Sequence, residues 1–311
     1  MDRIIDGFRY VGQVIPDSWE VRKFTVGGHT EISARQRVTW TESPDLVPAC
    51  RDGDGYKGAP TLEQLAKWEK QDAADVAERK AKALEQSAKR AKTMCRRVIK
   101  AEAFNELLTL TYRENQTDRE LCKKHFTIWF KRMKRTLGEF RFCASFELQK
   151  RGAMHVHVAT HKLPKSALYK GVKIKSWELG TRIWRDIVGH EIAGPMPFGV
   201  TRPKSENGLC FVGGKSKFGA PNKQKPLSCG RMANYVSKYI LKGFEDAPEE
   251  KNRYSRSNGT DVPKSTLVQI DNCTLAELIG LVFECGEGDV VIAHSIGRGD
   301  SYWLVTEPGG G

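Results

Sequence analysis

The chain has 311 residues, enough to bury a hydrophobic core without disulfide support. Lys and Arg outnumber Asp and Glu by 51 to 38, and the resulting net charge of +13 favours an anionic partner, for which nucleic acid is the natural candidate. The sequence argues against a membrane protein and a zinc finger, because it has no apolar run of about 18 residues and its eight cysteines form no CxxC pair.

The first part of the chain contains two predicted segments. Residues 1–60 mix short apolar runs with turn signals such as Gly27-Gly28, which predicts a β-rich or irregular segment. Residues 61–103 follow Pro60 and are rich in Ala, Glu, Lys and Arg, which predicts a long charged helix. Such a helix is either solvated and laced with salt bridges or a DNA-binding arm, and we favour the first interpretation.

Residues 104–260 alternate between strand and helix patterns. Apolar and β-branched runs predict strands, and apolar residues at helical spacing predict helices. The predicted strands are 104–112, 140–149 and 154–160, and the predicted helices are 119–137, 177–188 and 232–242. This order is typical of an α+β domain with an antiparallel sheet and flanking helices.

The end of the chain differs in charge from the rest. Residues 244–311 hold twelve Asp or Glu against five Lys or Arg, and we therefore treat 261–311 as a separate acidic segment. Within it, residues 289–294 and 301–306 predict a small hairpin.

Two histidines form the first candidate site. His155 and His157 are two residues apart on a predicted strand, so their imidazoles point to the same face. The preceding strand places Glu147 and Gln149 on one face beside them. Two imidazoles and one oxygen ligand leave open positions on a divalent ion. We choose Glu147 as the third ligand for its charge, with Gln149 as the alternative.

A pair of tyrosines forms the second candidate site. Tyr235 and Tyr239 are four residues apart on a predicted helix, so both hydroxyls lie on one stripe. Phenol needs a nearby cation or a polarised target before it can attack phosphorus, and Lys238 and Lys242 are suitably spaced cations. The alternative is an ordinary amphipathic helix face.

Taken in order, these motifs resemble the HUH endonuclease superfamily. The segments that carry the resemblance are Leu108-Thr109-Leu110-Thr111, Glu147 to His157, and Tyr235-Val236-Ser237-Lys238-Tyr239, with Arg253 to Ser257 as a weaker match. The resemblance is strongest to the two-tyrosine rolling-circle replication initiators of phages and plasmids. It covers about residues 104–260 and implies a ferredoxin-like or RRM-like core.

The resemblance implies a specific chemistry. Mg²⁺ or Mn²⁺ would be held by His155, His157 and Glu147 or Gln149, and Tyr235 or Tyr239 would attack the scissile phosphate. The products would be a 5′-phosphotyrosine and a free 3′-hydroxyl, and the second tyrosine would serve strand transfer. The implied location is the cytoplasm of a bacterial host.

The expected partner is single-stranded or supercoiled origin DNA. Lys150, Arg151 and Lys242 are the predicted DNA contacts beside the two candidate sites. The segment 208–216 does not have the spacing of a phosphate-binding P-loop and predicts a basic, flexible loop. With no nucleotide site, duplex unwinding would depend on a host helicase.

Three other functions are compatible with these motifs. A rolling-circle transposase or a conjugative relaxase would use the same chemistry. A non-catalytic regulator would use the basic surface and the aromatic residues only to bind single-stranded DNA. A non-haem iron enzyme also uses two histidines and a carboxylate, but the paired tyrosines would then have no role.

Overall fold

The structure is a computed structural model that describes residues 2–5, 8–43, 62–149, 152–193, 208–212, 228–246, 253–286 and 290–308. The chain divides into two compact units, one formed by residues 1–77 with 263–311 and the other by residues 78–262. The long helix α1 (Leu62–Ala101) runs through the boundary between them. No helix in the described ranges is both long and apolar enough to cross a membrane.

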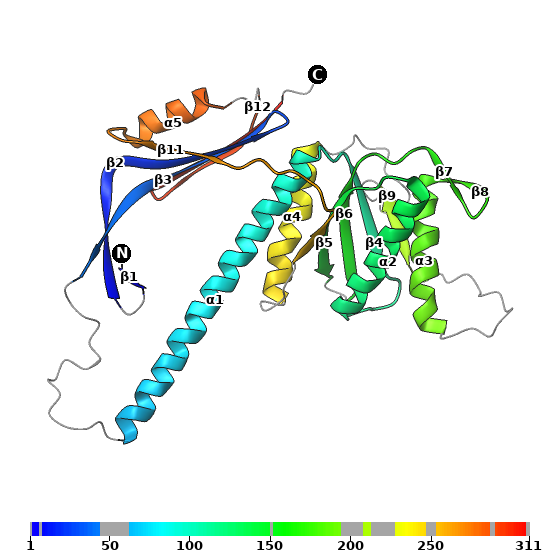
Figure 1. Ribbon diagram of the computed structural model, residues 1–311, viewed down its shortest axis with the longest axis horizontal. Coiled ribbons are helices and arrows are strands. Elements are labelled where there is room, and N and C mark those ends of the chain that lie inside the picture. The colour runs from blue at the N-terminus through cyan, green and yellow to red at the C-terminus, as the bar shows by residue number, and fades with distance from the viewer. Residues whose placement is uncertain are drawn as a thin grey trace. The chain divides into compact units, whose positions relative to one another are not determined.

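The first unit is an antiparallel sheet built from both ends of the chain (Figure 1). Its strand order is β1-β2-β3-β13-β12, and β11 also pairs with β2. Helix α5 (Leu275–Glu284) packs on this sheet around Trp19 and Leu278. The strands are β1 (Asp2–Ile5), β2 (Phe8–Val26), β3 (His29–Glu42), β11 (Thr266–Ile270), β12 (Val290–Gly297) and β13 (Ser301–Glu307).

The second unit is a five-stranded antiparallel sheet in the order β10-β5-β6-β4-β9. The chain order β4-α2-β5-β6-α3-β9 is the βαββαβ arrangement of ferredoxin-like folds. The predicted α+β fold with an antiparallel sheet and flanking helices is therefore confirmed. The strands are β4 (Glu106–Thr111), β5 (Phe142–Leu148), β6 (Met154–Thr160), β9 (Leu209–Val212) and β10 (Tyr254–Arg256).

Helices cover both faces of this second sheet (Figure 1). On one face, α2 (Arg119–Leu137) and α3 (Ser176–Ala193) bury a core that includes Trp129 and Trp184. On the other face, α1 and α4 (Cys229–Asp246) bury a smaller core around Val98 and Val236. Alternate residues of the central strands therefore face two different cores.

Local signals explain where α2 begins and ends. The Asp118 side chain accepts a hydrogen bond from the backbone N–H of Leu121 at 3.0 Å, which satisfies a free donor of the first turn. Gly138 follows the last turn with a φ of 80°, a conformation that favours glycine. The predicted range of 119–137 is confirmed.

Two short elements were not predicted from the sequence. β7 (Ser166–Tyr169) and β8 (Val172–Lys175) form a separate hairpin whose turn has positive φ at Lys170 and Gly171. β9 forms an edge strand where the sequence predicted a flexible loop, so that prediction was wrong for residues 209–212. Pairing with β4 gives this short apolar run its backbone hydrogen bonds.

The cysteines behave as predicted in the described part of the chain. The seven described cysteines are free, and five of them are buried. The Sγ atoms of Cys95 and Cys143 lie 3.5 Å apart between α1 and β5. Burial raises the pKa of the Cys143 thiol, with a further rise from the adjacent Cys95.

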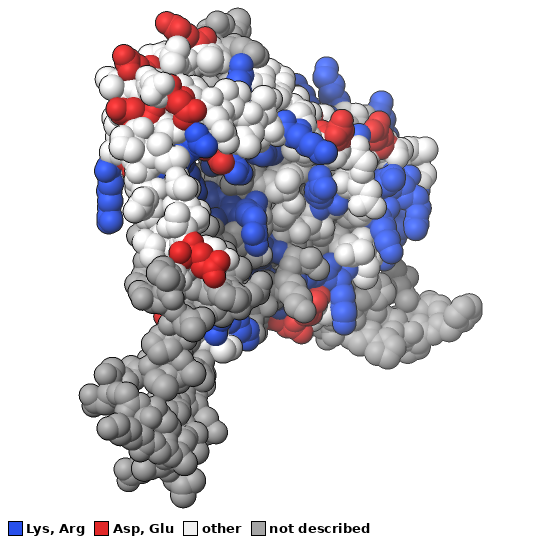
Figure 2. Space-filling model, turned by 60° about the vertical axis from the view of Figure 1, so that its left-hand side comes forward, with Lys and Arg blue, Asp and Glu red and all other residues white. Residues whose placement is uncertain are grey.

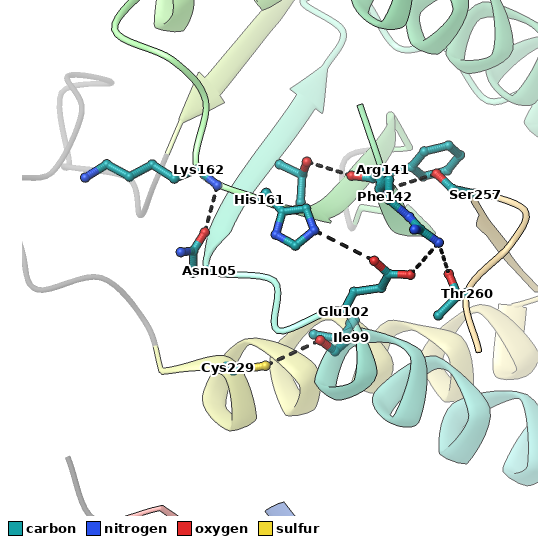
Figure 3. A network of polar contacts seen from close by, with 11 residues as sticks. Ile99, Glu102, Asn105, Arg141, Phe142, His161, Lys162, Cys229, Ser257 and Thr260 are labelled. Atoms are coloured by element: carbon teal, nitrogen blue, oxygen red, sulfur yellow. Dashed lines mark hydrogen bonds and ion pairs between the residues drawn. The ribbon is translucent and has the colours of Figure 1, made fainter. Parts of the chain in front are cut away.

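A polar network fastens the end of α1 to one end of the second sheet (Figure 3). The carboxylate of Glu102 binds the guanidinium of Arg141 at 2.7 Å and lies 3.7 Å from the imidazole of His161. The Glu102 side chain is only 9% exposed, and Arg141 also donates to the hydroxyl of Thr260. Removal of the carboxylate would leave Arg141 without its anion in a partly buried position.

We therefore expect Glu102→Ala to lower the free energy of unfolding by about 1–3 kcal/mol, because the loss of one partner of a largely buried pair leaves the other uncompensated. Glu85→Ala is the matched control, since Glu85 and Lys89 form an exposed pair on α1 and its loss should cost less than about 0.5 kcal/mol. Urea unfolding followed by circular dichroism measures both. Equal losses in the two variants would contradict a structural role for the Glu102 network.

Candidate active site

The face of the sheet beneath α4 carries two rows of polar side chains. Thr109, His157 and Ser145 are cross-strand neighbours on β4, β6 and β5. Thr111, His155 and Glu147 form the next row in the same register. Because side chains alternate along a strand, all of these residues share the face that α4 covers. The second row lies at the opposite end of the sheet from the Glu102 network.

Glu147 connects the sheet to α4. Its Oε2 lies 3.0 Å from Nε2 of His157, and its Oε1 accepts a hydrogen bond from the ammonium of Lys242. The Glu147 side chain is 10% exposed, whereas that of Lys242 is 40% exposed. Burial raises the pKa of Glu147, but the hydrogen bonds and charges of His157 and Lys242 outweigh this effect and lower the pKa to about 2.

Both predicted tyrosines contact the histidine pair. The ring of Tyr239 stacks on that of His157 with centroids 4.1 Å apart and planes 15° apart. Tyr235 meets the same imidazole edge to face at 5.4 Å and meets Tyr239 at 5.3 Å. The structure therefore brings the strand motif and the helix motif into direct contact.

The amphipathic pattern of α4 produces this contact. Val236 and Ile240 are buried against α1 and β5, which fixes the rotation of the helix. The stripe with Tyr235, Tyr239 and Lys242 then turns toward the polar face of the sheet. The helix pattern is therefore both a packing face and a means of placing two phenols.

Lys238 lies over both phenol rings. Its Nζ is 4.5 Å from the ring centroid of Tyr235 and 4.8 Å from that of Tyr239. Burial raises the pKa of Tyr239 well above its ordinary value, followed by the hydrogen bond with Tyr235 and the charge of Glu147. Tyr239 is thus neutral near pH 7, and its ionisation would require added positive charge nearby.

The remaining predicted residues have different positions. His155 is buried beside His157, with ring centroids 6.2 Å apart. Gln149 lies beyond the end of β5, where its backbone closes the hairpin turn through Gly152 and Ala153. Lys150 and Arg151 lie outside the described residues.

The donor types suit a divalent cation, but their present arrangement is not that of a closed metal site. Among the described residues, no group of three His, Cys, Asp or Glu has the geometry to hold a metal ion. Glu147 is directed to Lys242 and to one nitrogen of His157, so a metal ion would have to replace these contacts. An ionised carboxylate beside two buried imidazoles nevertheless provides the ligands that such an ion prefers.

Ser145 is a site residue that the sequence analysis did not identify. Its side chain is fully buried, and its Oγ has no hydrogen-bond partner within the described ranges. A buried hydroxyl in this state favours a further polar species at the site. The signal was the two-residue alternation that Ser145 shares with Glu147, together with Thr109 and Thr111 on the neighbouring strand.

The comparison with protein families agrees with this part of the chain. Residues 105–244 match the model of a family described as Replication-associated protein ORF2. The match covers slightly less than half of the chain and includes the histidine strand and the tyrosine helix. It supports a role in DNA replication. No curated protein and no solved structure gave a significant match.

The lowered pKa of Glu147 predicts how the site affects stability. A carboxyl group whose pKa falls from 4.5 to about 2 on folding stabilises the protein above pH 4.5 and loses this effect as the pH falls toward 2. We expect Glu147→Gln to be less stable than the wild type near neutral pH. The difference should shrink as the pH falls from about 4.5 toward about 2.

Urea unfolding at a series of pH values measures this difference. The control is Glu139→Gln, which changes an exposed carboxylate and should give a small difference with little pH dependence. A Glu147→Gln effect that stays constant over the acidic range would show that the carboxylate is not ionised and paired as described.

Proposed function

We propose that the protein is a metal-dependent endonuclease that nicks one DNA strand through a tyrosine to initiate rolling-circle replication. The observation that carries this proposal is the cluster in which His157 contacts Glu147, Tyr235 and Tyr239. A nucleophile, its neighbouring cations and a set of metal ligands therefore lie together. The family match to replication-associated proteins supports the biological setting.

The metal ligands in this proposal are His155, His157 and Glu147. Glu147 is preferred to Gln149, because its carboxylate is ionised and contacts His157. When bound, Mg²⁺ or Mn²⁺ would polarise the scissile phosphate as a Lewis acid. The unpartnered hydroxyl of Ser145 could donate to a phosphate oxygen or water at the same face.

The nucleophile is the phenol oxygen of Tyr235 or Tyr239. The ammonium of Lys238 lies over both rings, where its positive charge would stabilise a developing phenolate. Tyr235 is the more exposed of the two, while Tyr239 is held against His157. Both hydroxyls belong to one cluster, which suits two successive transfers.

The proposed reaction is a transesterification. The phenol oxygen forms a bond to phosphorus, the bond from phosphorus to the 3′-oxygen breaks, and the phenol loses a proton while the leaving oxygen gains one. The products are a 5′-phosphotyrosine and a free 3′-hydroxyl that can prime synthesis. Because the phosphodiester energy is retained in the adduct, the second tyrosine can carry out a later transfer that rejoins strands.

The charge distribution supports a DNA substrate. The chain carries a net charge of +13. Figure 2 shows Lys and Arg side chains spread over one face of the molecule, with Asp and Glu in a few groups. Lys242, which is partly exposed beside Glu147, is a proposed contact for the DNA phosphate near the nick. A host helicase would be a further partner.

Covalent adduct formation tests this function. The wild-type protein, incubated with Mn²⁺ and supercoiled DNA that carries the cognate origin, should relax the DNA and become linked to a 5′ end. The Tyr235→Phe, Tyr239→Phe double variant should form no adduct, because it lacks both phenol oxygens. Denaturing gel electrophoresis of labelled DNA measures the product.

Two controls separate chemistry from binding and folding. His155→Ala, or excess chelator with the wild type, should abolish cleavage while DNA binding changes little, because phosphate contacts supply most of the non-specific affinity. Tyr254→Phe changes a tyrosine on β10 outside the cluster and should retain activity. An adduct with the double variant would contradict the nucleophile assignment, and DNA binding without any adduct in the wild type would favour the non-catalytic regulator.

The same chemistry would serve a transposase or a relaxase. The match to a replication-associated family favours the replication initiator over these alternatives. Mapping the nick to a replication origin supports the initiator, whereas a nick at a transposon end or a transfer origin contradicts it.

A further inference from the structure

Helix α2 presents a row of cations on the side opposite its core face. Lys124, Lys131 and Arg135 are exposed and lie at spacings of seven and four residues, which places them on one stripe about 16 Å long. The buried side of α2, which includes Trp129 and Met133, faces the sheet. The stripe therefore faces away from the protein interior.

The β7–β8 hairpin extends this charged surface. Lys170 at the turn and Lys173 on β8 are exposed, and the hairpin contains no acidic residue. Arg135 and Lys170 line one pocket of about 240 Å³, so the helix and the hairpin meet there. We call the surface formed by Lys124, Lys131, Arg135, Lys170 and Lys173 the basic ridge.

The cations of the ridge are not neutralised by the protein. In the described part of the chain, none of them forms an ion pair with Asp or Glu. The acidic residue at the shared pocket is Asp186, and its carboxylate binds Arg132 at 2.5 Å. Like charges such as Lys131 and Arg135, four residues apart on a helix, slightly destabilise it.

Part of this charge has a structural explanation. Arg135 lies in the last turn of α2, where a cation offsets the negative end of the helix dipole. Lys124 lies in the second turn, and Lys170 and Lys173 belong to a hairpin, so the dipole does not account for them. Their common property is an exposed positive charge on a continuous surface.

The ridge lies on the opposite face of the sheet from the tyrosine cluster. Its helix, α2, packs with α3 on one face, whereas α4 lies on the other (Figure 1). Single-stranded DNA is usually bound by cations interleaved with exposed aromatic rings. The ridge lacks such rings, because Tyr169 packs against the core. Its chemistry instead fits the regular phosphate backbone of a duplex.

We propose that the basic ridge binds the phosphate backbone of duplex DNA adjacent to the strand that is cut. This inference rests on the proposed function for its DNA substrate, but it concerns a separate surface. The ridge positions the duplex through charge without reading its sequence, and the tyrosine cluster acts on a single strand at the other face.

The test variant is Lys131→Ala, Arg135→Ala, Lys170→Ala in the full chain. The control is Lys80→Ala, Arg90→Ala, Lys264→Ala, which removes the same charge from exposed positions elsewhere. Fluorescence anisotropy with a labelled duplex of random sequence, between about 50 and 200 mM NaCl, gives the affinity and its salt dependence. Thermal unfolding checks that both variants fold.

We expect the ridge variant to bind the duplex at least about tenfold more weakly than the control. The slope of log Kd against log salt should fall by about 2 to 3, because each lost phosphate contact removes about 0.9. Binding of a labelled single strand, and adduct formation on a short single-stranded origin, should change far less. The Lys131→Arg, Lys170→Arg variant preserves the charge of the ridge and should keep the duplex affinity of the wild type.

Duplex affinity and salt slope equal to those of the charge control would overturn the proposal. An equal loss of single-strand affinity would also overturn it, because the ridge would then not favour a duplex. The result separates this inference from the proposed function. Normal adduct formation without ridge-dependent duplex binding refutes only the ridge, whereas ridge-dependent duplex binding by a protein that forms no adduct refutes only the nicking chemistry.

Discussion

The contact between His157 and its three neighbours is the interaction on which the account of this protein depends. A buried imidazole needs partners for its nitrogens, and Glu147 supplies one of them at 3.0 Å. Tyr239 covers the ring, and Lys242 balances the carboxylate from the same helix. Packing of α4 on the sheet therefore requires these polar groups to meet, and their meeting creates a place where phosphate chemistry can occur.

This arrangement has an energetic consequence for function. The ion pair of Glu147 with Lys242 stabilises the helix on the sheet, yet a divalent ion would compete for the same carboxylate. The exposed end of Lys242 is free to follow a different anion, such as a phosphate, if the carboxylate binds metal. The site thus combines a stable contact in the absence of ligand with a route to a second set of contacts.

Much of the second unit could be predicted from the sequence because its signals are local. The limits of α2 follow from Asp118 and Gly138, and the face of His155 and His157 follows from the alternation along a strand. The contact between His157 and Tyr239 was expected only from the family resemblance, because no local pattern determines how a helix rotates on a sheet. That rotation depends on the buried contacts of residues such as Val236.

Other features depend on contacts between distant parts of the chain. The two ends of the chain pair through β3 and β13 in one sheet, although their sequence patterns indicate separate segments. The short apolar run of β9 is a strand because β4 offers it an edge. Ser145 gained significance only when its strand neighbours were known, since a lone serine in an apolar strand carries no signal.

Identification of the residue that becomes linked to DNA tests the central claim most directly. The adduct formed with origin DNA would be digested with nuclease and trypsin, and the peptide that carries the residual nucleotide would be sequenced by mass spectrometry. The account predicts a phosphodiester-linked nucleotide on Tyr235 or Tyr239. A nucleotide on a tyrosine outside α4, such as Tyr112 or Tyr254, or on a serine, would contradict it.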